Sequence, residues 1–269
     1  MKVLLTGATG TLGRPLARAL LAEGFEVRAL SRRAQPGGDD IEWARGDLRT
    51  GEGVAEAVAG IEAIVHAATL SGIQNGEAKA RYILFHPTHT DVGGAQRLVD
   101  AAAAAGVGHF LFTSVVGIEK VPLGYYKHKL AAEAIVEGSG VPYTIARATQ
   151  FHELVDATVR YALKYPIPIM VRKQRVQPID PSDVAPLVAG LLSRGPSDGI
   201  VNFGGPEEMT MGEAADVWLE DRGVRRRIRT LPLPGKAGRA MAAGALCTPD
   251  HSGRTTWREW LRAHPKEGS

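Results

Sequence analysis

The chain has little cysteine: Cys247 is the single thiol among 269 residues. One thiol can form no disulfide within the chain and can build no zinc site from thiolates, so a disulfide-rich fold and a zinc-finger fold are excluded. Long apolar runs are also missing, since none approaches the roughly 18 residues that a spanning helix needs. The start, MKVLLTGATG, reaches a glycine turn too early for an export signal. We therefore expect a cytoplasmic globular protein with no metal and no membrane partner.

Charge is unevenly distributed along the chain. The net charge is +3, but residues 221–269 hold eleven Lys/Arg and four Asp/Glu, a balance of +7 that leaves −4 for the first 220 residues. The tract RRRIR at 225–229 could bind nucleic acid, yet neither zinc-ligand spacing nor a basic strand interleaved with aromatic residues accompanies it. We expect no nucleic-acid partner. The tract is either a solvated basic surface or one that faces an anionic ligand.

Short apolar strands alternate with helical segments in the first half of the chain. Strands are expected at residues 2–5, 25–31, 41–45, 63–68, 109–114 and 143–148, and helices at 14–23, 53–60, 91–105 and 125–137. Strands joined by helices of this length form right-handed βαβ units and a parallel sheet. The expected fold class is therefore α/β, with a doubly wound parallel sheet.

In the second half of the chain, strands and helices alternate less regularly. Helices are expected at 181–192, at 210–223 behind a Thr210/Glu213 capping box, and at 255–264, with a strand at 200–205. The last of these helices places Trp257 and Trp260 on one face, as core anchors rather than ligand platforms. We expect this part to form a small C-terminal lobe that packs against the sheet.

A glycine-rich turn lies between the first strand and the first helix, in TGATGTLG at residues 6–13. Glycines at this place allow positive φ and a close backbone approach to a pyrophosphate, and the helix N-terminus offers free N–H groups to the phosphates. A purely structural turn is the alternative. The residues expected to hold the cofactor here are Gly7, Thr9, Gly10, Thr11, Leu12 and Gly13.

The second strand ends in LSRR, with Arg32 and Arg33 where NAD-binding proteins usually carry an acidic residue for the ribose 2′-hydroxyl. Guanidinium groups match a phosphate in a bidentate manner, so this pair favours the 2′-phosphate of NADP(H) over NAD(H). Two exposed loop arginines are the alternative. Further cofactor contacts are expected where later strands end, at Asp47, Leu48, Ala67, Ala68, Thr69, Ala148 and Thr149. His66, in the same region, is expected to be a buried strand residue rather than a metal ligand.

Tyr125 and Lys129 begin the helix after the fifth strand. Their i,i+4 spacing puts both side chains on one helix face, near the carboxyl ends of the strands, where open α/β sheets bind ligands. The neighbouring Tyr126 has Leu130 at that spacing and lacks this partner. Tyr125 and Lys129 are thus candidate site residues, with a packing role of Tyr125 as the alternative.

Together these motifs resemble the short-chain dehydrogenase/reductase superfamily, and within it the atypical NmrA-like, NAD(P)H-binding group. The resemblance rests on TGATGTLG, SRR, GDL, HAAT, TSVVG, YYKHK, RATQF and PIDPSDVA. It implies a Rossmann domain over residues 1–150, with substrate-side elements and the small lobe at 151–269. It also implies that Ser114 holds a substrate carbonyl, that Tyr125 moves a proton, and that Lys129 binds the nicotinamide ribose and lowers the tyrosine pKa. The chain departs from the pattern at Asp91, where many relatives have asparagine.

The resulting hypothesis is an NADPH-dependent reductase that delivers hydride to a small carbonyl or quinone-like substrate. Gln150 and Phe151 are expected beside that substrate, while His152 is either a further contact or an exposed residue at a helix start. A protein that senses NADP(H) without turnover is the main alternative, and sugar-nucleotide epimerisation is a third.

Overall fold

The computed structural model describes residues 1–33, 40–69, 73–74, 77–78 and 88–265. Its centre is a seven-stranded sheet with the order β11-β8-β7-β4-β1-β2-β3, and every neighbouring pair in it is parallel. The strands of this sheet are β1 (Lys2–Thr6), β2 (Glu26–Ser31), β3 (Ile41–Arg45), β4 (Ala63–His66), β7 (His109–Val115), β8 (Tyr143–Ala148) and β11 (Gly199–Phe203). The expected α/β fold with a doubly wound parallel sheet is confirmed.

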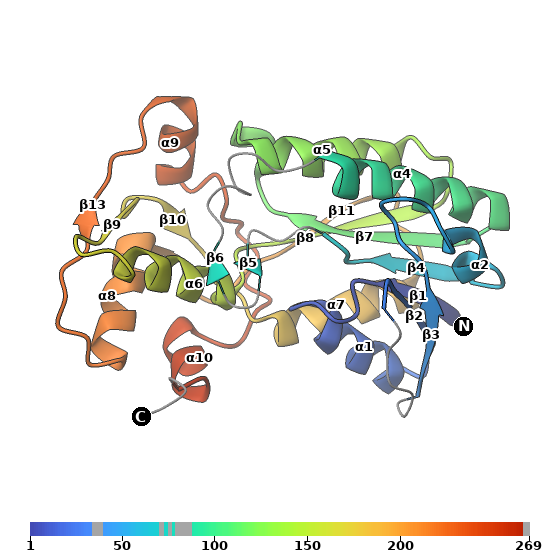
Figure 1. The fold of residues 1–269 in the computed structure, drawn as a ribbon, viewed down its shortest axis with the longest axis horizontal. Coiled ribbons are helices and arrows are strands. Elements are labelled where there is room, and N and C mark those ends of the chain that lie inside the picture. The colour runs from blue at the N-terminus through green and yellow to red at the C-terminus, as the bar shows by residue number, and fades with distance from the viewer. Residues whose placement is uncertain (34–39, 70–72, 75–76, 79–87, 266–269) are drawn as a thin grey trace.

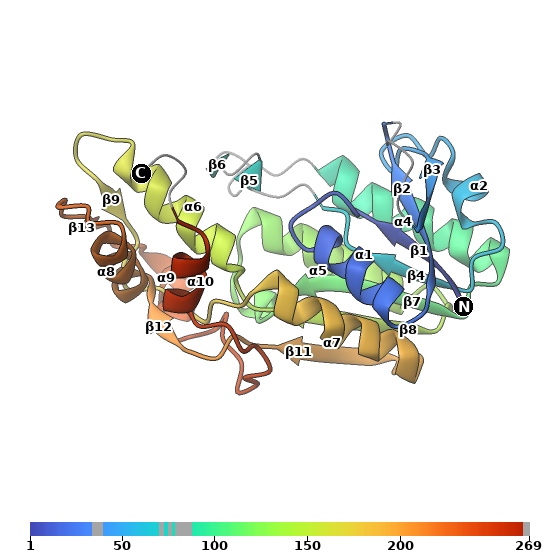
Figure 2. The same ribbon diagram turned by 90° about the horizontal axis from the view of Figure 1, so that it is seen from below.

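Helices cover both faces of the sheet, as Figure 1 shows. On one face lie α1 (Gly13–Ala22) and α7 (Pro181–Arg194), which run side by side in Figure 2. On the other face lie α2 (Val54–Val58), α4 (Thr88–Ala105) and α5 (Gly124–Glu137). Side chains alternate between these layers, since Val3 and Leu5 pack toward α1 while Leu4 between them packs toward α2 and α4. Both sheet faces are buried, which explains the nearly continuous apolar strands in the sequence.

The sheet extends past residue 150. Strand β11 pairs in parallel with β8 at its edge, and α7 packs on α1, so residues 181–203 belong to the sheet layers. A domain boundary at residue 150, which the resemblance implies, therefore does not coincide with the end of the sheet. Among the described helices, none is long and apolar enough to cross a membrane.

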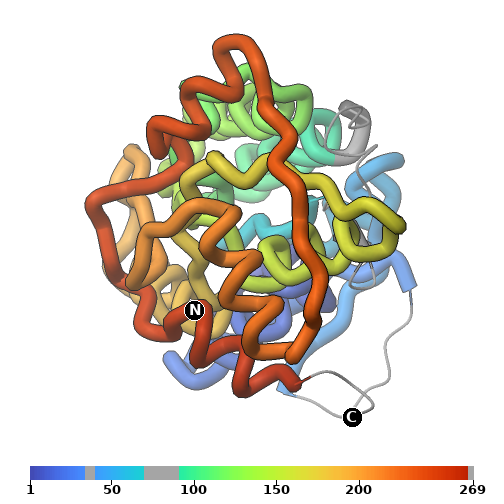
Figure 3. The backbone as a smooth tube through the Cα atoms, turned by 90° about the vertical axis from the view of Figure 1, so that its left-hand side faces the viewer, coloured from blue at the N-terminus to red at the C-terminus, as the bar shows by residue number. Residues whose placement is uncertain are grey.

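The remaining elements form a small lobe beyond the carboxyl edge of the sheet. This lobe faces the viewer in Figure 3. Its helices are α6 (His152–Leu163), α8 (Met211–Asp221), α9 (Gly235–Ala242) and α10 (Trp257–Ala263). Its short strands pair as β9 (Ile169–Met170) with β13 (Arg229–Thr230), and as β10 (Arg175–Val176) with β12 (Met209–Thr210). Elsewhere β5 (Ile73–Gln74) pairs with β6 (Glu77–Ala78), and a 3₁₀ turn, η1, spans Ile118–Lys120.

The lobe has a core of its own. Trp257 and Trp260 of α10 are 1% and 5% exposed and stack at 5.4 Å between ring centroids, so their expected role as core anchors is confirmed. The capping box that opens α8 is also present, since Thr210 and Glu213 bond each other's backbone N–H groups.

Candidate cofactor and catalytic site

The turn after β1 is shaped for a close backbone approach. Gly7 has φ of +74°, and a Cβ there would lie 2.7 Å from the backbone nitrogen of Ala68, at the end of β4. A Cβ on Gly13 would overlap the carbonyl oxygen of Gly7. Larger side chains at either position would therefore separate the turn, the sheet and α1, which is why the sequence has glycine at both.

The N-terminus of α1 is open to an anion. The residue before the helix, Leu12, gives no side-chain cap, and the first turn of the helix has no acidic residue. Thr9, Gly10 and Thr11, which precede it, are exposed. Uncapped N–H groups at the positive end of a helix dipole attract phosphate, so this turn fits the pyrophosphate of a dinucleotide.

Arg32 and Arg33 lie exposed beyond the carboxyl end of β2. The backbone N–H of Arg33 donates to the hydroxyl of Ser31 at 3.2 Å, which holds the turn. Neither guanidinium forms an ion pair with any residue that the structure describes. Both charges are thus available to a phosphate beside the adenosine ribose.

The other residues expected to contact the cofactor differ in their burial and in the hydrogen bonds that they already form within the protein. Ala67 and Ala68 are half-buried beside Gly7, and Leu48 is buried against α4. Asp47 already accepts a hydrogen bond from the N–H of Arg49 at 2.8 Å. Their cofactor contacts remain predictions.

His66 is a buried strand residue, as expected, because its ring is 2% exposed and its Nδ1 lies 2.6 Å from the hydroxyl of Thr6. Burial, and then the nearby charge of Lys129, lower the pKa of His66 to about 3, so the ring stays neutral. The Thr6 hydroxyl also accepts a hydrogen bond from the N–H of Ala68 at 3.2 Å, which joins the ends of β1 and β4.

Ser114 lies near the carboxyl end of β7, and Lys129 bonds the same strand one residue earlier, at Thr113. The hydroxyl oxygen of Ser114 is buried and has no hydrogen-bond partner within the described part of the chain. Lys129 is 4% exposed, donates from Nζ to the carbonyl oxygen of Thr113 at 3.0 Å, and lies 4.7 Å from the ring centroid of Phe112. An orphaned buried hydroxyl is costly in a closed core and useful to a ligand that bonds it.

Tyr125 lies one turn before Lys129 on α5 and is half-buried. Burial raises the pKa of its hydroxyl well above the usual value, and the charge of Asp91 raises it further, while a hydrogen bond with Thr69 opposes the rise. The resemblance implied that Lys129 lowers this pKa, but in the protein alone the pKa shifts upward. The tyrosine is thus held as a neutral phenol, the form that can donate a proton.

Asp91 is a member of this site that the sequence pointed to only as a departure from a pattern. It lies in the first turn of α4 and is 4% exposed. Burial lowers the pKa of Lys129, whereas Asp91 and then Glu133 raise it. Glu133 is itself held by two hydrogen bonds from Arg147, at 2.9 and 2.6 Å. Asp91 is therefore the buried carboxylate that acts on both Tyr125 and Lys129.

The polar side chains directly after β8 already form hydrogen bonds within the protein. The Thr149 hydroxyl donates to the Gln177 carbonyl at 2.6 Å, and the Gln150 side chain bonds the Leu246 carbonyl and the Gln177 N–H. Ala148 is buried in the sheet, and Phe151 is half-buried beside the core of the sheet. The substrate and cofactor contacts expected of these residues remain predictions.

His152 is not the exposed residue that one interpretation expected. Its ring is fully buried, lies 3.0 Å from the Thr255 carbonyl oxygen, and stacks on Trp257 at 5.6 Å between centroids. Burial lowers its pKa to about 4, so it is a neutral ring that joins α6 to α10.

The parallel sheet, the glycine turn and the open helix N-terminus define a dinucleotide-binding protein. Comparison with protein families agrees, because the NAD(P)H-binding family model matches residues 7–194. The chain belongs to this NAD(P)H-binding family of atypical short-chain dehydrogenases/reductases.

Individual curated relatives match only part of the chain, at about one third sequence identity. The chain is 34% identical over 165 residues to sterol demethylase protein B of Methylococcus capsulatus, covering 60% of this chain and 48% of the relative. It is 33% identical over 160 residues to the photosystem II assembly factor Ycf39 of Cyanophora paradoxa, covering 57% and 46%. The chain thus spans about half the length of these curated relatives.

Among solved structures, the NADPH-dependent quinone oxidoreductase QOR2 of Escherichia coli, complexed with NADPH, superposes with a TM-score of 0.76. The superposition covers 97% of this chain and 99% of the quinone oxidoreductase, at 18% sequence identity. At this identity the likeness supports the fold alone.

Proposed function

We propose that the protein is an NADPH-dependent reductase that transfers hydride to a small carbonyl or quinone-like substrate. The observation that carries this proposal is the buried, unpartnered hydroxyl of Ser114 at the strand end to which Lys129 is bonded. It is the kind of donor that a carbonyl oxygen would satisfy. The family match supports cofactor binding.

In the proposed reaction each residue has one task at the substrate oxygen. Ser114 Oγ donates a hydrogen bond to the carbonyl and orients it. Tyr125 Oη gives its proton to the same oxygen, and the ammonium of Lys129 offsets the negative charge that the phenol then carries. Bound NADPH would supply the hydride, and the glycine turn and the two arginines after β2 would hold its phosphates.

Reduction needs Tyr125 as the protonated phenol, the form in which burial and Asp91 hold it, whereas oxidation of an alcohol would need the phenolate. A raised pKa also makes the phenol a weaker acid, so in this proposal the ammonium of Lys129 has to stabilise the phenolate as the proton leaves.

The test is NADPH oxidation with a panel of aldehydes, ketones and quinones. Tyr125→Phe keeps the ring and removes the hydroxyl, so turnover is expected to fall by about 10²–10⁴, the usual contribution of positioned acid–base catalysis, while NADPH affinity stays. Tyr126→Phe is the matched control, because this neighbour has no lysine at i+4 and packs against α9. Full activity in Tyr125→Phe would overturn the mechanism, and tight NADPH binding without turnover on any substrate would favour a cofactor sensor.

A further inference from the structure

Exposed apolar side chains gather at one end of the C-terminal lobe. Five of the seven large hydrophobic side chains that are exposed among the described residues lie in two short segments there: Tyr165, Ile167, Ile169, Leu231 and Leu233. The two segments are neighbours in space, since β9 pairs in parallel with β13 and places Ile169 beside Arg229. Figure 1 shows this pair at the end of the long axis opposite β1, β2 and β3.

The folded backbone, rather than poor packing, turns these side chains outward. Along the first segment Ile167 and Ile169 are 57% and 48% exposed, whereas Met170 is 5% exposed and part of the lobe core. Along the second, Ile228 is 3% exposed and Leu231 is 50% exposed. The inward positions already fill the core, so the outward apolar side chains add nothing to it and mark a contact surface.

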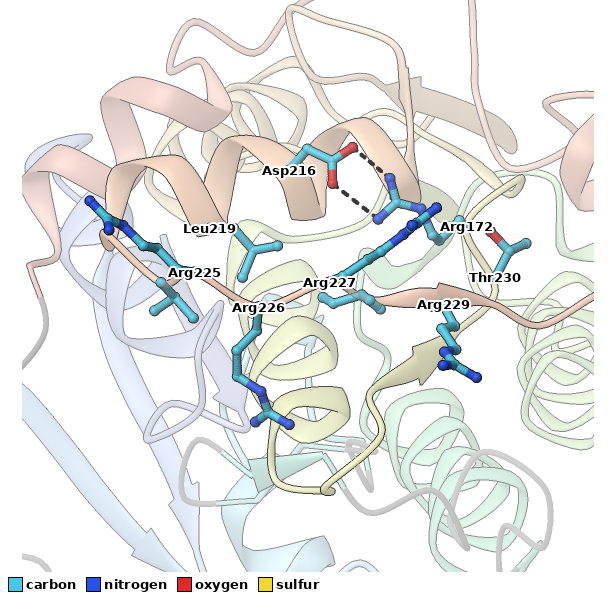
Figure 4. A pocket seen from close by; sticks show the side chains of 10 residues that line it. Arg172, Asp216, Leu219, Arg225, Arg226, Arg227, Arg229 and Thr230 are labelled. Carbon is cyan, nitrogen blue, oxygen red and sulfur yellow. Dashed lines mark hydrogen bonds and ion pairs between the residues drawn. The ribbon is translucent and has the colours of Figure 1, made fainter.

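Arginines precede Leu231 in the second segment, and one of them, Arg229, lies beside Ile169. Arg225, Arg227 and Arg229 are exposed, and none of them forms an ion pair with a described residue. Together with Arg172, which pairs with Asp216, they line an open hollow of about 970 Å³ (Figure 4). The surface therefore combines apolar tips with unpaired positive charge.

Arg226 differs from its neighbours and fixes the surface. Its guanidinium donates to the carbonyl oxygens of Leu163, Tyr165 and Pro166 at 2.7, 2.7 and 2.9 Å. These bonds hold the first segment against the second, and so keep the exposed apolar side chains of both segments near the arginines at 225–229.

We propose that this surface binds the face of a lipid bilayer that carries acidic headgroups. The guanidinium groups pair with lipid phosphates, and the isoleucine and leucine side chains enter the boundary between headgroups and acyl chains. Exposed isoleucine and leucine side chains beside exposed arginines suit the interfacial layer of a bilayer, where acyl chains take up the apolar side chains and acidic headgroups lie at the level of the guanidinium groups. No spanning helix is required, so the sequence-based expectation of no membrane partner, which rested on the lack of such a helix, does not address this contact.

The test is flotation of the full-length protein with vesicles of phosphatidylcholine alone or with about one third phosphatidylglycerol. Wild type is expected to float with the acidic vesicles at low salt and to be released as salt rises. Arg225→Gln/Arg227→Gln/Arg229→Gln is expected to weaken binding to the acidic vesicles roughly a hundredfold, because each arginine near the bilayer surface contributes about a factor of five. Arg226 is left intact because it holds the segments together.

Two further variants separate the contribution of these particular arginines from that of overall charge, and the contribution of charge from that of the apolar side chains. Arg18→Gln/Arg45→Gln/Arg194→Gln removes the same charge from exposed arginines elsewhere, which form no described ion pair, and should keep most of the binding. Ile167→Ser/Leu231→Ser/Leu233→Ser keeps every charge and should lose the part of the binding that persists at high salt.

Failure of the wild type to bind acidic vesicles at low salt would overturn the proposal, as would equal losses in the two arginine variants. If soluble polyglutamate competes fully, and the serine variant binds vesicles as the wild type does, the surface is a docking site for an acidic protein and the membrane proposal is wrong.

Discussion

Lys129 Nζ donates a hydrogen bond to the carbonyl oxygen of Thr113 at 3.0 Å, and Thr113 directly precedes Ser114 in β7. This bond ties the helix that carries Tyr125 to the strand that carries the serine. Because Lys129 is 4% exposed, its charge also acts at short range, with little water between it and its neighbours.

Lys129→Met is expected to lower both NADPH affinity and turnover. Methionine matches the length of the lysine stem and tolerates burial, so the fold should persist while the ammonium is lost. The affinity should fall roughly tenfold, the scale of one lost hydrogen bond to a charged group. Fluorescence titration with NADPH measures it, and Lys127→Met, at an exposed position on the same helix, is the control. Unchanged affinity and rate would show that Lys129 serves only the fold.

NADP(H) is expected to bind more tightly than NAD(H), because Arg32 and Arg33 lie exposed without described ion pairs at the end of β2. Arg32→Ala/Arg33→Ala should reduce NADPH affinity by at least about tenfold, on the scale of charge-assisted hydrogen bonds, and leave NADH affinity nearly unchanged. Calorimetric titration of both proteins with both cofactors measures this. Equal dissociation constants for the two cofactors in the wild type would contradict the assignment.

Asp91→Asn is expected to lower the pKa of Tyr125, because it removes a buried negative charge that disfavours the phenolate. The two other groups that act on the phenol, Thr69 and Tyr126, are not altered by this substitution. Phenolate absorbance can be titrated with pH in each protein and in its Tyr125→Phe counterpart, and the difference isolates Tyr125. This measurement needs no turnover. In a reductase assay the same variant should lose activity at a lower pH than the wild type, because the proton leaves the donor earlier.

Asp100→Asn, at an exposed position further along α4, is the matched control for this titration and should leave it unchanged. An unaltered Tyr125 titration in Asp91→Asn would show that the aspartate does not act on the phenol.

Glu153→Gln is expected to stabilise the protein at alkaline pH. In the folded protein, burial raises the pKa of Glu153 from 4.5 to about 7, and its Oε2 has no described hydrogen-bond partner. The folded protein thus binds this proton more tightly than the unfolded chain, so the wild type loses stability as pH rises from 4.5 through 7. The variant should be more stable by up to about 3 kcal/mol above pH 7 and similar to the wild type below pH 4.5. Urea unfolding across this range measures it, with Glu137→Gln, exposed on α5, as control; a difference that does not vary with pH would refute the explanation.

The fold was predictable because local patterns and long-range packing demand the same residues. A continuous apolar strand such as Val3–Leu5 needs helices on both faces, and Gly7 and Gly13 are required by backbone contacts that leave no space for a Cβ. The i,i+4 spacing of Tyr125 and Lys129 likewise follows from helix geometry alone. His152 was not predictable, since a helix-start histidine is equally compatible with solvent and with the tryptophan stack that the lobe places around it.

The alternation of strands and helices and the glycine turn could be predicted from the sequence, because periodicity and spacing act within a few residues, and the same patterns pointed to the candidate site residues. The tertiary structure alone decided which charges meet. Asp91 is more than thirty residues from Tyr125 in the chain, and only the packing of α4 on α5 brings its charge to the phenol. It also decided that Ile169 and Arg229, sixty residues apart, face outward together, because pairing between strands follows from the global fold and not from either segment.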